Sequence, residues 1–499
     1  MDDRKALSAT AERAGILPRR AMTKMLGAAC GGIALYAGLP ARATLTTSRD
    51  YTSRRPPASE RRFTSPAVEE KIVEVRRAIS DPELAWLFEN CFPNTLDTTV
   101  EFAVRGGRPD TLVITGDIPA MWLRDSTAQV TPYLPLARHD ARLKELIAGV
   151  INRQTRCILI DPYANAFSFG RAGACPWGEH DQTKTRPELC ERKWEVDSLC
   201  YPVRLAHAYW RATGDTSCFD ADFRQAGRLV LQTFREQQRK SGPGPYAFQR
   251  QAASPYDTLP LDGRGNPTRP VGLIHSGFRP SDDACVYPLL VPSNFFAVVA
   301  LKQLAELHDS AFGDRAFAGE CRSLAQEVSD ALARHAVVRH PARGLIWAYE
   351  VDGFGNSLMM DDANVPSLLS LPYLGCCPPG DPVYRRTRAF VLSEDNPYFF
   401  RGRAGEGVGG PHVGLGMVWP LGVTMRALTS EDEGEIAFCL RMLKATHAGT
   451  GFMHEAFSKD DPAKFTRSWF AWANTLFGEL ILHVHSTRPG LLGPGSGRA

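Results

Sequence analysis

The residues best suited to chemistry in this sequence lie in short polar segments between apolar helical stretches. These segments are rich in carboxylates, arginines and aromatic rings. That combination is typical of a sugar site, because sugar C–H faces stack on aromatic rings while hydroxyls pair with carboxylates and guanidinium groups. Each residue alone could be a core aromatic or a helix cap, but the set as a whole favours a site. Its members are Asp117, Trp122, Arg124, Asp125, Trp194, Glu195, Asp197, Arg279, Asp282, Asp283, Trp347, Tyr349, Asp361, Asp362, His412, Trp419, His454, Glu455, Arg467, Trp469 and Trp472.

Two carboxylates in this set could support glycoside hydrolysis, which needs one proton donor and a second carboxylate that activates water or attacks the anomeric carbon. In the segment Arg-Pro-Ser-Asp-Asp, we expect Asp283 to cap a helix and Asp282 to face a cleft. The adjacent like charge is expected to raise the pKa of one of the two, as a general acid requires. Glu455 lies in a loop before the last helices, and spacing does not determine where it lies relative to Asp282.

Other kinds of active site find little support. The sequence has no G-x-S-x-G elbow, no P-loop, no G-x-G-x-x-G after a strand and no H-E-x-x-H, and the glycine-rich segment 405–410 is interpreted as a loop. Cys376, Cys377 and His412 are three conceivable zinc ligands without an obvious fourth. A zinc enzyme using them is kept as a rival hypothesis. We expect no metal and no cofactor.

A phrase containing an aspartate, a small residue and a following Tyr or Pro recurs four times. The aligned aspartates are Asp125, Asp197, Asp283 and Asp362, at steps of 72, 86 and 79 residues. An aspartate just before an apolar helix is an N-cap signature. Repeated at a step of two helix lengths, it predicts helical hairpins whose inner helices begin on one rim, an all-α toroid. Four unrelated caps are the alternative.

The apolar periodicity supports the all-α interpretation. Period-2 patterns are scarce, with short strand candidates at 111–114 and 348–351. The composition indicates one domain over 67–487, preceded by a linker at 44–66 and followed by a loose tail at 488–499. The predicted helical segments are 136–160, 203–210, 221–234, 295–307, 317–338, 436–445 and 471–483.

The first 43 residues have the layout of an export signal. The paired Arg19 and Arg20, the weak apolar stretch 26–39 and the small-x-small pattern at 41–43 are similar to a twin-arginine signal. We therefore expect an exported protein, periplasmic or secreted, with no membrane span in the mature chain. Because such proteins leave the cytoplasm folded, most of the 12 cysteines are expected to be reduced and buried.

The length, composition and net charge exclude several classes of protein. The 499 residues have 43% hydrophobic and 23% charged side chains, which is typical of a globular protein and excludes a disordered or fibrous chain. A formal charge of +3, from 58 basic and 55 acidic residues, gives no electrostatic case for nucleic acid as a partner.

Seven motifs together resemble the family 125 glycoside hydrolases. They include Trp-Leu-Arg-Asp, Arg-Pro-Ser-Asp-Asp and Met-His-Glu, and they extend over nearly all of the expected domain. The resemblance implies an (α/α)6 barrel and a metal-independent, inverting exo-α-1,6-mannosidase. Its substrates would be α-mannoside oligosaccharides of the N-glycan or mannan type. The motifs lie at 115–131, 193–203, 275–286, 291–298, 360–370, 451–458 and 465–482.

Carried over by motif, the resemblance implies that Asp282 is the general acid and Glu455 the general base, with Asp283 as the alternative acid. Arg124 and Asp125 would hold the terminal mannose. The role of 240–270 stays open. A non-catalytic glycan-binding toroid and an α-glycosidase of another sugar or linkage remain alternatives. The remaining residues expected to bind substrate are Asp117, Trp122, Glu195, Asp197, Arg279, Asp283, Asp362, His412, His454 and Arg467.

Overall fold

The computed structural model describes residues 51–171 and 173–493. The expected export signal at 1–43 lies outside the described residues. Residues 51–65, within the predicted linker, contact the helices that follow them. Arg55 Nε donates to Asp97 Oδ2 at 2.7 Å, and its Nη1 donates to Glu69 Oε2 at 2.8 Å. No helix in the described part is long and apolar enough to cross a membrane.

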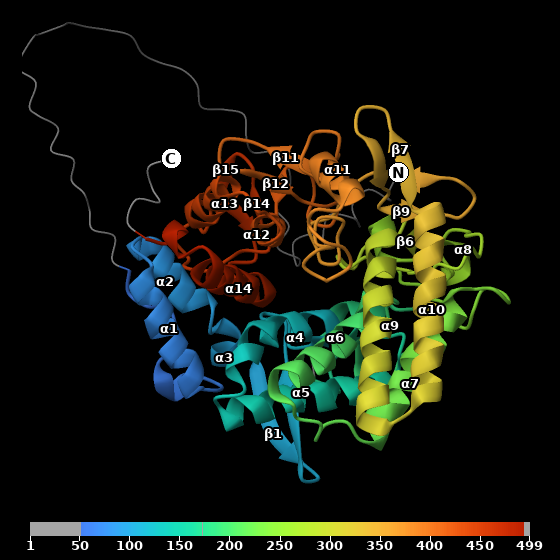
Figure 1. Ribbon diagram of the computed structural model, residues 1–499, viewed down its shortest axis with the longest axis horizontal. Helices are drawn as coiled ribbons and strands as arrows, with labels where there is room; N and C mark the ends of the chain where they lie inside the picture. Colours follow the sequence, from blue (N-terminus) through green and yellow to red (C-terminus); the bar gives the residue numbers. More distant parts are fainter. Residues whose placement is uncertain (1–50, 172, 494–499) are drawn as a thin grey trace, which may run out of the picture. The chain divides into compact units, whose positions relative to one another are not determined.

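Five inner helices form a ring in which α4 packs against α6 and α14, α6 against α9, and α12 against α14 (Figure 1). They are buried nearly all round at their N-terminal ends; α4 buries all of its 8 residues. Most residues of α4 are polar, so their burial depends on hydrogen-bond partners from neighbouring elements, such as Gln154, which donates to Ser126 and Thr127. The inner helices are α4 (Leu123–Val130), α6 (Val196–Thr213), α9 (Val291–Phe312), α12 (Pro420–Leu428) and α14 (Ala471–Thr487).

The outer helices are amphipathic and cover the inner ones. Pairs such as α9 with α10, α12 with α13, and α14 with α2 pack side by side. The predicted all-α toroid, an (α/α)6 barrel, is therefore confirmed. The outer helices are α2 (Pro82–Cys91), α5 (Ala141–Ile160), α7 (Ala221–Gln237), α10 (Arg315–His335), α11 (Pro382–Val391) and α13 (Glu433–Ala445), and shorter helices are α1 (Pro66–Ala78), α3 (Asn94–Thr98) and α8 (Pro260–Gly263).

An irregular segment takes the place of a further inner helix. Residues 364–374 form turns, and they are bonded to three helices around them. The Tyr201 hydroxyl of α6 donates to the Val365 carbonyl at 2.8 Å, and the Tyr384 hydroxyl of α11 donates to the Leu369 carbonyl at 2.8 Å. Within the segment, the Tyr373 hydroxyl donates to Glu479 of α14 at 3.0 Å.

Short antiparallel sheets lead into the inner helices. Strands β3, β6 and β13 end where α4, α9 and α12 begin, and pairing with neighbouring strands fixes these entry points. The sheets are β1 (Val100–Arg105) with β2 (Arg108–Val113); β3 (Met121–Trp122) with β4 (Ala166–Phe167) and β5 (Leu189–Glu191); β6 (Leu289–Leu290) with β9 (Glu350–Val351) and β10 (Ser357–Leu358); β7 (Val337–His340) with β8 (Gly344–Trp347); β11 (Phe399–Arg401) with β12 (Glu406–Val408); and β13 (Met417–Val418) with β14 (Ala456–Ser458) and β15 (Asp461–Thr466).

The predicted helical segments fall within α5, α6, α7, α9, α10, α13 and α14, with two boundary errors. The segment 136–160 begins too early, because Asp140 caps α5 and residues 131–136 form a 3₁₀ helix. The segment 317–338 ends too late, because β7 begins at Val337. The 3₁₀ helices are η1 (Ala58–Glu60), η2 (Thr131–Leu136), η3 (Pro176–His180), η4 (Pro255–Asp257) and η5 (Pro489–Leu491).

The predicted N-cap role of the four repeated aspartates is wrong. Asp125 is the third residue of α4, Asp197 is the second residue of α6, Asp283 lies before β6, and Asp362 precedes the irregular segment. The inner helices begin at residues that make no side-chain cap bond. Aspartates do cap outer helices, and these are Asp81, Asp140, Asp220, Asp314, Asp381 and Asp432.

Candidate active site

A pocket opens where α4, α12 and α14 begin. The lining side chains come from the first turn of α4, from Trp419 just before α12, and from Phe470 and Trp472 at the start of α14. The loop 279–283 and the loop before β14 complete the wall. The pocket is lined by Thr115, Ile118, Trp122, Arg124, Asp125, Pro280, Ser281, Asp282, Asn364, His412, Trp419, Glu455, Arg467, Phe470 and Trp472.

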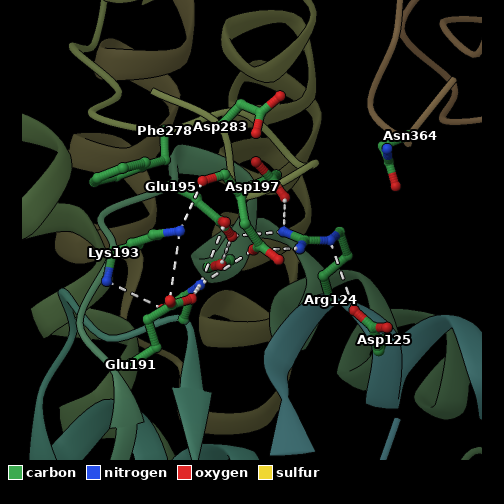
Figure 2. Close-up of polar contacts among 12 residues, drawn as sticks. Arg124, Asp125, Glu191, Lys193, Glu195, Asp197, Phe278, Asp283 and Asn364 are labelled. Carbon is green, nitrogen blue, oxygen red and sulfur yellow. Dashed lines mark hydrogen bonds and ion pairs between the residues drawn. The ribbon is translucent and has the colours of Figure 1, made fainter. Parts of the chain in front are cut away.

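Arg124 is the centre of the buried charges beside this pocket (Figure 2). Its Nη1 donates to Glu195 Oε2 at 2.5 Å and to Asp197 Oδ2 at 3.2 Å. Its Nη2 donates to Asp282 Oδ1 at 3.2 Å, and its Nε lies 3.7 Å from Asp125 Oδ2. One guanidinium therefore joins four carboxylates from three segments, and these carboxylates in turn raise the pKa of Arg124 despite its burial.

Asp282 presents its carboxyl to the pocket from a tight loop. Its N–H donates to the Arg279 carbonyl at 2.9 Å, and the Arg279 N–H donates to the Asp283 carbonyl at 2.7 Å. The backbone of Asp282 has φ +67°, a left-handed conformation that is costly for a residue with a Cβ. The side chain of Asp282 is 27% exposed, in contrast to the buried carboxylates around Arg124.

Protons in this cluster favour the most buried carboxyls. Burial raises the pKa of Glu195 well above its ordinary value, although Arg124 opposes this, and burial also raises the pKa of Asp125 to about 6. Burial acts in the same direction on Asp282, but Arg124 and Lys193 outweigh it, and the pKa of Asp282 is lowered. The hydrogen bond between the two carboxyls acts on them in opposite directions: it raises the pKa of Glu195 and lowers the pKa of Asp282.

The expectation that the Asp282–Asp283 doublet raises the pKa of its acid is therefore wrong for Asp282. The two carboxyls turn to different partners. Asp282 faces the cations Arg124 and Lys193, whereas Asp283 Oδ1 lies 3.0 Å from His412 Nδ1. Burial acts to lower the pKa of His412, but the bond to Asp283 and nearby carboxylates outweigh it and raise that pKa to about 9. His412 is thus a cation at the pocket rim.

Glu455 lies in the loop between α13 and β14, which is tied to the start of α14. The Met453 N–H donates to Asn474 Oδ1 at 2.8 Å, and the Phe470 N–H donates to the Met453 carbonyl at 2.9 Å. The Glu455 side chain is 11% exposed, and Arg467 Nη1 lies 3.4 Å from its Oε1. Arg467 Nε also donates to Asp117 Oδ2 at 3.2 Å, so Asp117 helps to orient the arginine.

The other residues expected to bind substrate do not line the pocket. Glu195 and Asp197 lie behind Arg124, and Arg279 Nε donates to Glu350 Oε1 at 2.6 Å, which anchors the loop that carries Asp282. Asp362 Oδ1 accepts the Asn364 N–H at 3.0 Å. His454 stacks on Phe465 with centroids 3.8 Å apart and contacts the Arg467 carbonyl through Nδ1 at 3.1 Å.

Several lining residues were missed by sequence reasoning. Thr115, Ile118, Asn364 and Phe470 all fall inside the quoted motifs, but they lack the charge or indole ring that singled out the others. Four polar atoms of lining residues are buried and make no hydrogen bond to any described residue: Trp122 Nε1, Arg124 Nε, Ser281 Oγ and Trp419 Nε1.

Comparison with known proteins agrees with this geometry. The family described as metal-independent alpha-mannosidase (GH125) matches residues 81–482. The chain belongs to the GH125 family. It is therefore a glycoside hydrolase and an α-mannosidase, as the motifs predicted.

Two relatives extend over most of this GH125 chain. The "Meiotically up-regulated gene 157 protein" of Schizosaccharomyces pombe is 44% identical over 455 residues, covering 88% of this chain and 89% of the relative. A metal-independent alpha mannosidase from Streptococcus pneumoniae, solved as a non-productive substrate complex with alpha-1,6-mannobiose, is 42% identical. It has a TM-score of 0.82 and covers 86% of this chain and 100% of that one.

The rival zinc site is not assembled in this GH125 enzyme. His412 faces Asp283 in the pocket, whereas Cys376 lines a separate surface depression with Phe295 and Gly375. Within residues 51–171 and 173–493 no three His, Cys, Asp or Glu side chains come together in a way that could hold a metal.

One disulfide lies close to the GH125 pocket, and sequence spacing did not predict it. Cys175 bonds to Cys190 of β5, and an apolar cluster joins Cys190 and Trp177 to Trp122 at the pocket wall. The other described cysteines are free thiols, and most of them are buried: Cys91, Cys157, Cys200, Cys218, Cys285, Cys321, Cys376, Cys377 and Cys439.

Proposed function

We propose that this GH125 enzyme releases the non-reducing terminal mannose of α-1,6-mannosides with inversion, using Asp282 as general acid and Glu455 as general base. The main support for this proposal is that both carboxyls line one pocket. Arg124 contacts Asp282, and Arg467 contacts Glu455. The relative from Streptococcus pneumoniae, bound to alpha-1,6-mannobiose, supports the linkage.

Asp282 is better placed than Asp283 to serve as the general acid. Its carboxyl lines the pocket and is three times as exposed as that of Asp283, at 27% against 9%. Asp283 is engaged by His412. Asp282 is also hydrogen-bonded to Glu195, and it is the member of that pair that a substrate reaches. The pair therefore supplies the proton through Asp282.

The reaction is a single displacement. A water oxygen attacks the anomeric carbon while the glycosidic C–O bond breaks. Glu195, whose pKa is raised, passes its proton to Asp282 along their hydrogen bond. The leaving oxygen takes that proton from Asp282, and Glu455 takes a proton from the attacking water. Arg467 stays beside Glu455, with Nη1 3.4 Å from its Oε1, and keeps the carboxylate in place. The product is β-mannose.

The sugar that occupies the pocket is held by charged and indole groups. Arg124 and Asp125 face the pocket from the first turn of α4, and the indole N–H groups of Trp122 and Trp419 are free of protein partners in the described chain. These groups suit the hydroxyls of a terminal mannose. We infer oligosaccharides of the N-glycan or mannan type as natural substrates.

The test is proton NMR of α-1,6-mannobiose with the purified enzyme in EDTA. We expect β-mannose to accumulate before mutarotation produces the α anomer. Asp282→Asn and Glu455→Gln should each lower kcat by about 10²–10⁴-fold, the usual contribution of general acid–base catalysis. Asp283→Asn should lower it much less.

Three results would contradict parts of this proposal. Early α-mannose would overturn inversion. Hydrolysis of α-1,2 or α-1,3 disaccharides in preference to mannobiose would overturn the linkage. Binding of mannobiose that neither the enzyme nor its Asp282→Asn variant hydrolyses would favour the glycan-binding alternative.

We also propose export by the twin-arginine route, because Arg19 and Arg20 precede a weak apolar stretch and a small-x-small pattern. A reporter fused after residue 43 should leave the cytoplasm, and R19K with R20K should retain it there. Export that is insensitive to this double change would overturn the route.

A further inference from the structure

Lys193 lies directly behind Asp282. It follows β5, and its side chain is 4% exposed. Its Nζ donates to the backbone carbonyl of Asp282 at 2.9 Å and to Asp257 Oδ1 at 2.6 Å, and it lies 3.4 Å from Glu191 Oε1. Figure 2 shows Lys193 and Glu191 on the other side of Glu195 from Arg124.

Asp257 and Glu191 are themselves held by a second buried cation. Arg250 Nη1 donates to Glu191 Oε1 at 2.9 Å and to Asp257 Oδ1 at 3.1 Å, and its Nε donates to Asp181 Oδ1 at 2.5 Å. Arg250 and Asp257 both belong to the stretch 240–270, for which the sequence suggested no role. This stretch therefore fixes the carboxylates that hold Lys193.

The contact from Lys193 falls on the strained residue of the loop. Asp282 has φ +67°, a left-handed conformation that costs a non-glycine residue some free energy, although an aspartate less than most. The Asp282 N–H is bonded to the Arg279 carbonyl, and its carbonyl is bonded to Lys193. An ammonium fixed between two carboxylates is a well-placed donor for that carbonyl.

We propose that Lys193 is a positioning residue for the general acid: its ammonium, locked by Asp257 and Glu191, holds the Asp282 backbone in the conformation that presents the carboxyl to the glycosidic oxygen. This inference rests on the proposed role of Asp282. It gives the stretch 240–270 a function, which is to supply the carboxylate that completes the lock.

Lys193 also acts on the protonation of Asp282. The charged groups around Asp282 are Arg124 and Asp125 from α4, Glu195 before α6, His412 from the loop before β13, and Lys193. The positive charge of Lys193 lowers the pKa of Asp282. Its removal raises that pKa, so the high-pH limb of kcat/KM, where the acid loses its proton, should move to higher pH.

The experiment compares two substrates in Lys193→Met and Asp257→Asn. Hydrolysis of α-1,6-mannobiose needs a proton donor, whereas 2,4-dinitrophenyl α-mannoside has a leaving group that needs little help. We expect Lys193→Met to lower kcat on mannobiose by about 10²-fold, the low end of a general-acid contribution, with KM little changed. Activity on the aryl mannoside should fall only a few-fold. Asp257→Asn should show a smaller loss with the same substrate dependence.

Asp262→Asn is the matched control, because it removes the same charge from an exposed position of the same segment. Its backbone has φ +55°, which asparagine tolerates well. This variant should resemble the wild type on both substrates. Asp257 is 36% exposed at the edge of the cluster, so Asp257→Asn tests the lock even where Lys193→Met fails to fold.

Equal losses on both substrates with an unmoved high-pH limb would overturn the proposal, because a purely structural defect acts on both reactions alike. Full mannobiose activity in Asp257→Asn would show that Asp257 is not needed to hold Lys193 in place, which would overturn the proposal. Mannobiose hydrolysis that survives Asp282→Asn would instead refute the proposed acid itself. The Asp282→Asn measurement thus separates failure of the proposed function from failure of this inference.

Discussion

Arg124 Nη2 lies 3.2 Å from Asp282 Oδ1, and the other terminal nitrogen of the same guanidinium donates to Glu195 Oε2 at 2.5 Å. A single planar group therefore joins the proposed acid to Glu195, the carboxyl whose pKa burial raises. The two terminal nitrogens of the guanidinium, which form a planar fork, orient both carboxyls and also place a positive charge beside them. A lysine in this place would keep the charge but could not align both oxygens, since its ammonium is one compact point.

Arg124→Lys is accordingly predicted to lower kcat/KM on α-1,6-mannobiose by about 10²-fold or more. The loss reflects disordered proton transfer from Glu195 to Asp282, with positive charge retained. Steady-state kinetics with thermal unfolding of the same sample measures it. An activity within a few-fold of the wild type would contradict this account of the fork.

Arg55→Lys is the matched control for this change. Arg55 is also a buried fork, bonded to Glu69 and Asp97, but it lies outside the lining of the pocket. We expect this variant to lose stability while its kcat/KM stays near that of the wild type. Similar activity losses in both variants would mean that the loss of any buried arginine–carboxylate pairing impairs the enzyme, wherever it lies.

The helix order of this barrel could be predicted, but the reason given for it was incorrect. The repeated phrases aligned on Asp125 and Asp197 correctly marked the starts of two inner helices, yet neither aspartate is a cap. Both carboxyls are instead drawn to Arg124. A local pattern cannot distinguish a cap from a first-turn carboxylate that pairs with a distant cation. The irregular segment 364–374 was likewise beyond prediction, since it is fixed by hydrogen bonds that it accepts from Tyr201 and Tyr384 and by one that Tyr373 donates to Glu479.

The sequence allowed the residue types of the site to be predicted, but not the contacts between residues that are distant in the chain. Motif likeness singled out Asp282, Glu455 and Arg124, all of which line the pocket. The spacing of an Asp-Asp doublet suggested a raised pKa, but the partners that decide the sign, Arg124 and Lys193, come from elsewhere in the chain. Long-range contacts of this kind are invisible in a single sequence.

Chelators are predicted to leave the activity unchanged. The proposed reaction moves protons between carboxyls, water and sugar, and no cluster that could hold a metal is present among the described residues. Rates on α-1,6-mannobiose should be equal before and after dialysis against EDTA. A rate that is lost on dialysis and restored by added Zn²⁺ would revive the metal hypothesis.

The disulfide between Cys175 and Cys190 is predicted to stabilise the wall of the pocket. It closes a loop over a sequence separation of 15 residues, for which loop-closure entropy gives about 3 kcal/mol. Replacing both cysteines by serine should lower the free energy of unfolding in urea by about that amount. Reductant should shift the wild type in the same way and leave the double variant unchanged. A wild type insensitive to reductant would contradict the prediction.

His412 is predicted to make stability depend on pH above neutrality. The bond to Asp283 outweighs burial and raises the pKa of His412 from 6.5 to about 9. Because the folded protein binds this proton more tightly, the stabilisation is complete below pH 6.5 and is lost as the pH rises to about 9. The difference in free energy of unfolding between wild type and His412→Asn should shrink over that interval in urea titrations. In an Asp283→Asn background, the same pair should differ by a nearly constant amount. A difference that stays level in the wild-type background would show that His412 is neutral in the folded enzyme.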